Sequence, residues 1–164
     1  MATRSLIAQI DDNGVTVRAI YCHWDSYLEH NGRILQTHYE SVRTRELISM
    51  GNLSSLQAEI GEAHPFNRLE CGLNTEEWEA QYGNQCTFYG RDRGESNTEF
   101  CTYDSVAEMI HSARDCGAEF IYVLHGEEWF YSQRRYIEDS EGYKTRWTEL
   151  QSLAPALEAL EEKA

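Results

Sequence analysis

Residues 4–22, RSLIAQIDDNGVTVRAIYC, hold two mainly apolar runs, 4–10 and 15–22, joined by the sequence DDNG. An Asn-Gly pair between two such runs is typical of the turn of a β-hairpin. Arg18 alternates with apolar neighbours, which is the pattern of a strand with one face toward solvent. The stretch therefore predicts that the chain begins with two antiparallel strands.

The second half of the chain predicts further strands. EFIYVLH at 119–125 is a strongly apolar strand, GEE is a turn, and residues 128–133 form the returning strand of a second hairpin. Residues 86–89 are also strand-like. We expect residues 100–103 to be their partner, with GRDRGESNTE as the connecting loop.

Helices are expected between these strands. The segments with a helical pattern or helix-end residues are 32–39, 41–50, a short piece within 52–61, 75–83, 105–117 and 148–164. Gly51 is the expected C-cap of the second helix, and Ser54 or Ser55 would cap the third. SVAE, beginning at Ser105, is a capping box, and Pro155 would kink the last helix or begin its second half.

The order of these elements does not follow a strict βαβα alternation. It predicts an α+β fold, in which helices pack on a mostly antiparallel sheet, and one domain over residues 1–164. Residues 62–85 have little periodicity, so we expect an irregular insertion or a long functional loop there. The acidic C-terminus is expected to be helical.

The charge of the chain restricts its partners. The formal net charge is −14, and a field of that sign repels nucleic acid and anionic lipid, so no direct nucleic-acid binding and no membrane contact are expected. The charge is compatible with solubility alone, with binding to a basic protein surface, or with imitation of nucleic acid. All basic residues but two are arginines, which suit fixed bidentate contacts with carboxylate or phosphate.

Other features bear on location and on the cysteines. There is no run of about 18 apolar residues and no signal-peptide pattern, so a cytosolic protein is expected. The five cysteines are odd in number and form no CxxC pair, which predicts free, largely buried thiols in place of disulfides or a zinc site.

The segment YCHWDSY, residues 21–27, gathers polar-tipped aromatic side chains where a strand is expected to end. They offer ring faces together with hydrogen-bond donors and acceptors, and Asp25 can accept from the edge of a planar ring. The segment therefore suits a stacking platform for a nucleobase. The alternative is a strand end at which Trp24 and Tyr27 fill the rim of the core.

Two other chemistries for this segment are less well supported. His23, Asp25 and His38 are possible metal ligands, but the spacing is common by chance and no further ligand lies close in sequence, so no metal and no cofactor are expected. Cys22 next to His23 suggests a thiol nucleophile, but neighbouring side chains on a strand point to opposite faces. None of the common nucleotide, hydrolase or metal motifs is present.

The second polar segment is GRDRGE at 90–95. If it is extended, Arg91 and Arg93 point to one side and Asp92 to the other, while the two glycines let a ligand approach the backbone. Two guanidinium groups with free backbone N–H groups would form a phosphate or carboxylate clamp. The alternative is an exposed loop whose arginines pair with Glu95 or another surface acid.

These two segments resemble the motifs of a widespread family of small, largely uncharacterised bacteriophage proteins. The family carries a YCHWDGYP-like segment, a later HY on a helix, a G-x-L-S-x-L element and a FYGRDRGE-like loop. Here they correspond to residues 21–27, His38 with the tyrosine after it, residues 51–56 and residues 88–95, and EFIYVLHGEEWFY is similar too. Ser26 and Leu28 stand where the family has glycine and proline, so that turn is expected to differ.

The resemblance implies a shared site and a role, but no established chemistry. We expect both segments to face one cleft that sequesters a nucleotide-type immune signal without turnover, as a phage-encoded counter-defence protein in the host cytoplasm. A homo-oligomer would help to enclose the ligand, and a host defence protein is a further candidate partner. The expected ligand-binding residues are Tyr21, His23, Trp24, Asp25, Tyr27, His38, Tyr89, Arg91, Asp92, Arg93 and Glu95.

Two alternatives remain open. One is an acidic DNA mimic that inhibits a host nuclease, a restriction enzyme or a CRISPR protein, which would use the net charge of −14 and leave the arginines incidental. The other is an enzyme that cleaves or modifies a nucleotide with His23 or Asp25 as base. Binding without catalysis is the preferred interpretation.

Overall fold

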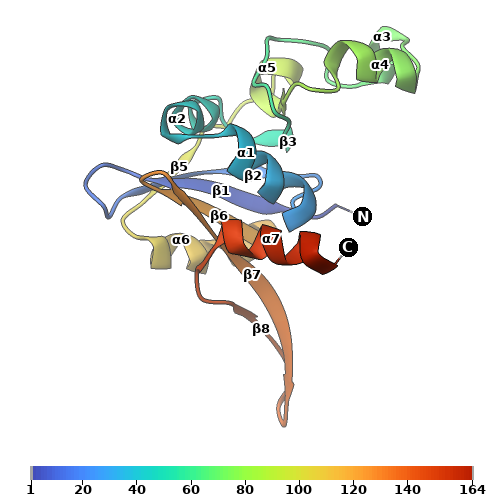
Figure 1. The fold of residues 1–164 in the computed structure, drawn as a ribbon. Coiled ribbons are helices and arrows are strands. Elements are labelled where there is room, and N and C mark those ends of the chain that lie inside the picture. The colour runs from blue at the N-terminus through green and yellow to red at the C-terminus, as the bar shows by residue number, and fades with distance from the viewer. Residues whose placement is uncertain (1, 164) are drawn as a thin grey trace.

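The computed structural model describes residues 2–163, apart from the side chains at positions 139 and 143. Over these residues the chain forms one nine-stranded mixed sheet, mostly antiparallel, with seven α-helices around it (Figure 1). This confirms the predicted α+β class. The strands are β1 (Ser5–Ile10), β2 (Val17–Cys22), β3 (Leu53–Ser55), β4 (Thr87–Phe88), β5 (Cys101–Tyr103), β6 (Phe120–His125), β7 (Glu128–Asp139), β8 (Gly142–Trp147) and β9 (Gln151–Ser152).

The helices fall between the strands and at the C-terminus. A π-helical turn, η1, precedes α1, and a 3₁₀ turn, η2, follows α6. Their bounds are η1 (Leu28–Gly32), α1 (Arg33–His38), α2 (Ser41–Ser49), α3 (Arg68–Cys71), α4 (Thr75–Tyr82), α5 (Tyr89–Arg93), α6 (Val106–Ser112), η2 (Ala113–Cys116) and α7 (Leu153–Lys163).

Both predicted hairpins are confirmed and form the centre of the sheet. The strand order is β4-β3-β2-β1-β6-β7-β8, with β5 paired to β2 and β9 to β7. In the first hairpin Ile7 lies opposite Ile20, and in the second Tyr122 lies opposite Tyr131. The hairpins join through β1 and β6, which run parallel.

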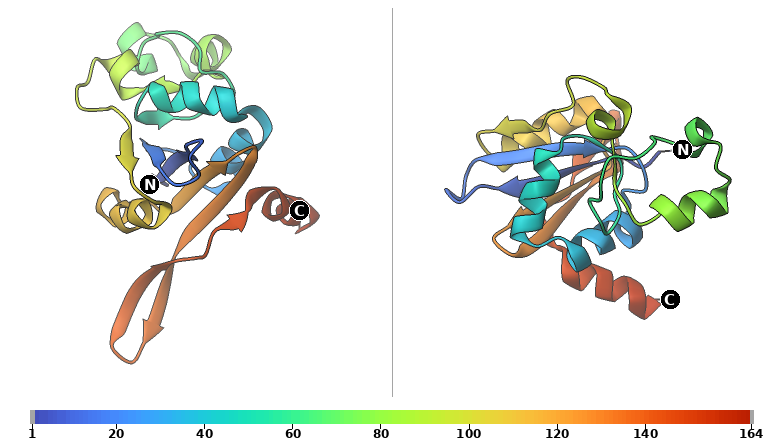
Figure 2. Two further views of the ribbon diagram at one scale, coloured as in Figure 1. Left: turned by 90° about the vertical axis from the view of Figure 1, so that its left-hand side faces the viewer. Right: turned by 90° about the horizontal axis from the view of Figure 1, so that it is seen from above.

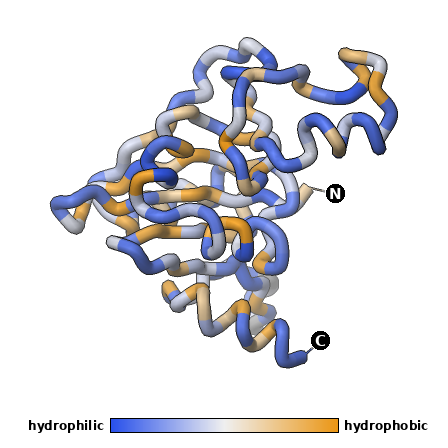
Figure 3. The backbone as a smooth tube through the Cα atoms, turned by 45° about the horizontal axis from the view of Figure 1, so that its top comes forward, coloured by the Kyte–Doolittle hydropathy of each residue, from blue (hydrophilic) through white to orange (hydrophobic). Residues whose placement is uncertain are grey.

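Alternating side chains of β1 and β6 build a core on each face of the sheet. On one face, Ile7 and Tyr122 belong to a buried cluster that includes residues of α1, α2 and α7. On the other face, Leu6 and Ile121 pack with Met109 of α6. The helices therefore cover both sides of the strands (Figure 2), and apolar residues concentrate along the central strands (Figure 3).

Three local predictions are wrong, and in each case contacts from distant parts of the chain decide the conformation. Residues 53–55 form β3 in place of a helix, because this segment pairs with both β2 and β4. Residues 101–103 form β5, which pairs with β2 and not with β4. Residues 89–93 form the helix α5 where an extended loop was expected.

The C-terminal helix is confirmed but shorter than predicted. It begins at Leu153, which places Pro155 in its first turn, where proline fits without a kink. The short strand β9 precedes the helix and pairs with β7. Leu153 and Leu157 are buried against the sheet, so the apolar face of the helix closes the core.

The insertion at 62–85 contains the predicted helix α4 and an unpredicted short helix α3. Neither helix has a buried residue, and both extend away from the sheet at one end of the molecule (Figure 1). The insertion thus forms a small lobe of its own beside the core. In residues 2–163, no helix has the length and apolarity needed to cross a membrane.

Replacing Gly51 with alanine is expected to lower the free energy of unfolding by more than the cost of about 1–2 kcal/mol that a side chain has at its φ of +85°. An added Cβ would also overlap the carbonyl oxygen of Thr98. Urea denaturation would measure the loss. Gly14→Ala is the matched control, since Gly14 has a φ of +77° but open space around it, so an equal loss in both variants would contradict a role for the contact.

Candidate functional site

The segment after β2 is held by a buried polar network and is therefore rigid. The Asn31 side-chain amide, fully buried, donates to the Trp24 carbonyl oxygen and to Ser26 Oγ, both at 3.1 Å. Tyr122 Oη donates to the Ser26 carbonyl oxygen at 2.6 Å, and Ser5 Oγ donates to Ser26 Oγ at 2.8 Å. Satisfied buried networks of this kind fix one conformation, so the loop presents its outer side chains in defined positions.

Asn31→Ala is expected to cost about 1–2 kcal/mol of unfolding free energy, because it removes the amide donor to the Trp24 carbonyl oxygen and one of the two donors to Ser26 Oγ. It should also loosen the loop that carries Trp24. Hydrogen exchange of the backbone amides at 24–31 measures both effects. Unchanged exchange in this variant would show that the network does not hold the loop.

The outer side of this loop exposes two aromatic rings. Trp24 is 43% exposed and Tyr27 is 39% exposed, while Asp25 takes a left-handed conformation with φ +56°. Both rings are thus partly buried at the edge of the core and partly open to solvent. An exposed Trp on a rigid loop is available for stacking.

The beginning of the segment is occupied by internal contacts. Tyr21 Oη and His23 Nδ1 are 2.6 Å apart, and the His23 ring packs edge-on against Trp24. Burial, followed by the charge of Arg4, lowers the pKa of His23, so its ring is neutral at neutral pH. Burial raises the pKa of Cys22 to about 12, which removes this thiol as a nucleophile.

The structure contradicts the predicted role of Arg91. Its guanidinium donates to the carbonyl oxygens of Ile60, Gly61 and Cys86 at 2.9–3.0 Å, and its Nε donates to Asp92 Oδ1 at 2.9 Å. All of its nitrogens are therefore engaged within the protein. Arg91 is a structural cation, and helix formation at 89–93 also prevents it from pointing with Arg93 as an extended clamp would require.

Asp92 is likewise structural, because its side chain has no exposed area. The carboxylate accepts the backbone N–H of Phe88 at 2.8 Å and that of His64 at 3.1 Å. His64 lies at the beginning of the insertion, and its ring stacks on Tyr82 at the insertion's far end. The Arg91–Asp92 pair thus fastens the insertion to the core.

Arg93 and Glu95 remain at the surface. Arg93 Nε lies 3.9 Å from Glu95 Oε2, and both side chains are about half exposed. The guanidinium of Arg93 lies over the rings of Phe66 and Tyr89, at 5.0 and 5.9 Å from their centroids. Phe66 and Tyr89 also contact each other, which connects the helix α5 to the insertion through aromatic side chains.

A hollow of about 400 Å³ lies between the loop after β2 and the insertion, and we call it the aromatic hollow. Trp24 borders it from the loop, while Phe66 and Trp78 border it from the insertion. Arg68 supplies a cation to its lining. The full lining is Trp24, Ser54, Ser55, Phe66, Asn67, Arg68, Thr75, Trp78, Glu79 and Thr87.

Of the predicted site residues, Trp24 is the one that lines the aromatic hollow. Tyr89 and Arg93 do not line it, but both contact Phe66, which does. Tyr21 lines a different hollow between β2, β5 and α6. The remaining residues do not line the aromatic hollow: His23 is turned toward Tyr21, Arg91 and Asp92 are internal, and Asp25, Tyr27, His38 and Glu95 lie at the surface.

Phe66, Arg68 and Trp78 were not predicted as site residues, because they lie in the insertion, where no periodicity marks a role. The available indication was chemical, since the insertion contains three aromatic residues among polar ones. His64 was missed for the same reason. Its ring packs against both Trp78 and Tyr82 and so supports the far wall of the hollow.

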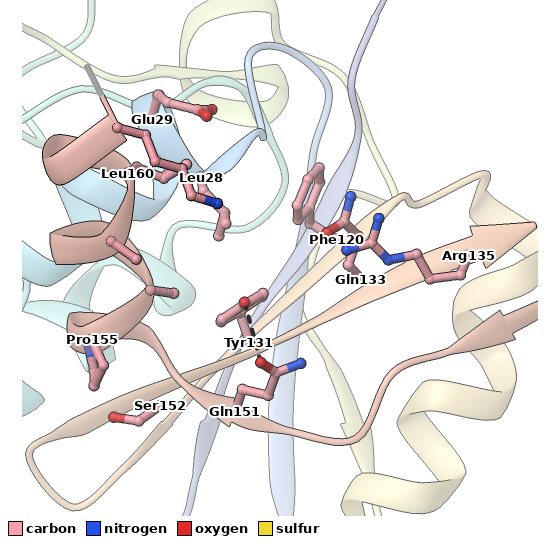
Figure 4. A pocket seen from close by; sticks show the side chains of 13 residues that line it. Leu28, Glu29, Phe120, Tyr131, Gln133, Arg135, Gln151, Ser152, Pro155 and Leu160 are labelled. Carbon is pink, nitrogen blue, oxygen red and sulfur yellow. Dashed lines mark hydrogen bonds between the residues drawn. The ribbon is translucent and has the colours of Figure 1, made fainter.

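A second and larger hollow, of about 810 Å³, lies between η1, β7 and α7, and we call it the α7 hollow (Figure 4). Phe120 and Leu160 contribute apolar surface to it. Arg135 extends from β7 toward Phe120, and Tyr131 Oη donates to Gln151 Oε1 at 3.5 Å. None of its lining side chains was predicted as a site residue.

Comparisons of the chain with protein-family models, with curated proteins and with solved structures gave no match. In the described part of the chain, no group of three or more His, Cys, Asp or Glu side chains is arranged to hold a metal ion.

Proposed function

We propose that this protein binds a small nucleotide-type ligand in the aromatic hollow and sequesters it. The observation that carries the proposal is the meeting of Trp24 with Phe66 and Trp78, since these rings come from separate parts of the chain and border one hollow. Aromatic side chains around a cavity of this size suit a planar ring, and each stacked base contributes about 1–3 kcal/mol to binding.

The polar lining matches the rest of a nucleotide. Arg68 is the cation for a phosphate, replacing the clamp that was expected from Arg91. Ser54, Ser55, Thr75 and Thr87 add hydroxyl groups that donate and accept hydrogen bonds. The Glu79 carboxylate accepts from a ribose hydroxyl or an exocyclic amine.

The lining favours binding over catalysis. It contains no His, Cys or Lys, so it lacks the Ser-His and Cys-His pairs of common nucleophilic sites, and Glu79 is its one carboxylate. His23 packs against Trp24 outside the hollow, and its Nδ1 is engaged by Tyr21. A binder without turnover suits the counter-defence role that the resemblance to small bacteriophage proteins implies, and we propose that role with it.

Native mass spectrometry tests this proposal on protein purified from bacteria in which a nucleotide-signalling defence is active. The expected result is a bound species with the mass of a nucleotide, released unchanged on denaturation. Release of an altered nucleotide would indicate an enzyme. The proposal would be contradicted if no nucleotide copurified with the protein and none bound when it was added.

A second candidate function, the acidic mimic of DNA, is favoured by the net charge of −14 and by the exposed Glu76, Glu77 and Glu79 on α4. Such a protein would bind the DNA-binding surface of a host nuclease, and its affinity would fall steeply as salt is added. A nuclease-inhibition assay at two salt concentrations distinguishes this function from nucleotide binding.

A further inference from the structure

The outer half of β7 and all of β8 form a two-stranded arm, residues 134–147, that projects from the body (Figures 1 and 2). Pairing of β7 with β6 ends at Gln133. Beyond that residue, β7 pairs with β8. Six residue pairs give the arm a length of about 20 Å.

The arm exposes an apolar side chain on each of its faces near its middle, because neighbouring residues of a strand point to opposite sides. Tyr136 is 69% exposed and Ile137 is 40% exposed. A two-stranded ribbon is marginally stable in water by itself, and exposed aromatic and aliphatic residues at its middle are typical of contact surfaces. The arm is therefore suited to pack against another surface.

Charge is distributed unevenly between the root and the tip of the arm. The root carries Arg134, Arg135 and Arg146, and the register places Arg135 opposite Arg146 on one face. The turn at the tip has the sequence EDSE at 138–141, with three acids in four residues. Lys144 pairs with Glu141 at 3.2 Å and offsets part of the tip charge.

The α7 hollow lies at the root of the arm. Arg135 borders it and reaches toward Phe120, while Lys163 adds a second cation and Gln133 and Gln151 add amide groups (Figure 4). The root thus carries an excess of cations beside a hollow that Glu29 also lines, and the tip of the same arm is an acidic turn. A single arm cannot bring its own tip to its own root.

We propose that two copies of this chain pair through their arms around a two-fold axis, with each acidic tip against the root and α7 hollow of the other copy. A two-fold interface is self-complementary, so the antiparallel alignment sets tip against root twice and brings Ile137 of both copies, which lies on the face of Arg135 and Arg146, toward the centre. The parallel alignment would set root against root and repel. Nucleic acid is a poorer partner, because the whole chain carries a charge of −14.

Sedimentation equilibrium over a concentration series measures the pairing. The wild-type chain is expected to dimerise, and added salt should weaken the dimer. Arg135→Glu with Arg146→Glu should weaken dimerisation about 10-fold or more, since every tip-to-root contact then meets like charge. Glu138→Lys with Glu141→Lys should weaken it similarly.

A mixture of the two charge-reversed chains is the decisive measurement. Neither variant should pair with itself, because its own root and tip carry charge of the same sign. In a mixed dimer the acidic root and tip of one variant meet the basic tip and root of the other, so a mixed dimer should form. Arg114→Glu is the control, because Arg114 is exposed outside the arm and should leave dimerisation unchanged. Thermal unfolding checks that every variant is folded.

Three results would overturn the proposal. They are a wild-type chain that stays monomeric at every concentration, a dimer that the arm variants leave intact, and a mixture that fails to pair. A fluorescent DNA duplex, added at low salt to the wild-type chain, tests nucleic acid as the alternative partner of the arm. Arm-dependent binding of that duplex by a monomeric chain would also contradict the proposal.

Discussion

Asp92→Ala is expected to lower the free energy of unfolding by about 3–5 kcal/mol, because it removes one member of a buried ion pair and leaves the other unpaired. The guanidinium of Arg91 would lose two of its hydrogen bonds. The backbone N–H groups of Phe88 and His64 would lose their acceptor at the same time. All four of these bonds end on a carboxylate with no exposed area.

The loss should be concentrated in the attachment of the insertion. The Asp92 carboxylate accepts the backbone N–H of His64 in the insertion, and the His64 ring stacks on Tyr82 of α4. When the carboxylate is removed, α3 and α4 are held more weakly, since neither contains a buried residue. The aromatic hollow would then lose the wall formed by Phe66 and Trp78.

Urea denaturation followed by tryptophan fluorescence measures this effect, and the melting temperature should fall by roughly 10 °C. Arg93→Ala is the matched control from the same helix, because Arg93 is more than half exposed and its contacts contribute less than about 1 kcal/mol. Equally small losses in the two variants would contradict the structural role of Asp92.

Trp24→Ala is expected to weaken nucleotide binding by about 1–3 kcal/mol, which corresponds to roughly 5- to 150-fold in the dissociation constant. Its ring is 43% exposed and borders the aromatic hollow, so its removal takes away a stacking surface while the core stays filled. Trp78→Ala should have a similar effect from the opposite wall. Calorimetric titration with the nucleotide identified by mass spectrometry measures both affinities.

Tyr27→Ala is the matched control for this prediction. Tyr27 is exposed to nearly the same degree as Trp24 and lies on the same loop, but it does not line the aromatic hollow. Its replacement should leave the affinity unchanged. If Tyr27→Ala weakened binding as much as Trp24→Ala does, the ligand would lie over the outer face of the loop and not in the hollow.

The parts of the fold that sequence predicted are those set by local patterns. The first hairpin follows from an Asn-Gly turn between apolar runs, α6 follows from its capping residues, and α4 was expected within 75–83. The pairing of β3 with β2 and β4 was not predictable in this way, because three residues carry no period. The strand β8 was not predicted either, because most of its side chains are polar.

The candidate site was predicted in part for the same physical reason. Trp24 stood out because aromatic residues gather around it in sequence. Arg91 and Asp92 were misassigned because a charged pair between glycines looks like an exposed loop, whereas the fold buries it under the insertion. Burial of an ion pair depends on residues more than 25 positions away, which local composition does not reveal.

The most direct test of the nucleotide site is an NMR titration that follows the indole N–H groups of the four tryptophans. A panel of mononucleotides and cyclic dinucleotides would be added in turn to the ¹⁵N-labelled protein. The account predicts that the signals of Trp24 and Trp78 shift together, while that of Trp129, whose indole N–H donates to the buried Tyr39 carbonyl oxygen, stays in place. Nucleotide-dependent shifts that spare both Trp24 and Trp78, or no shift with any nucleotide, would contradict it.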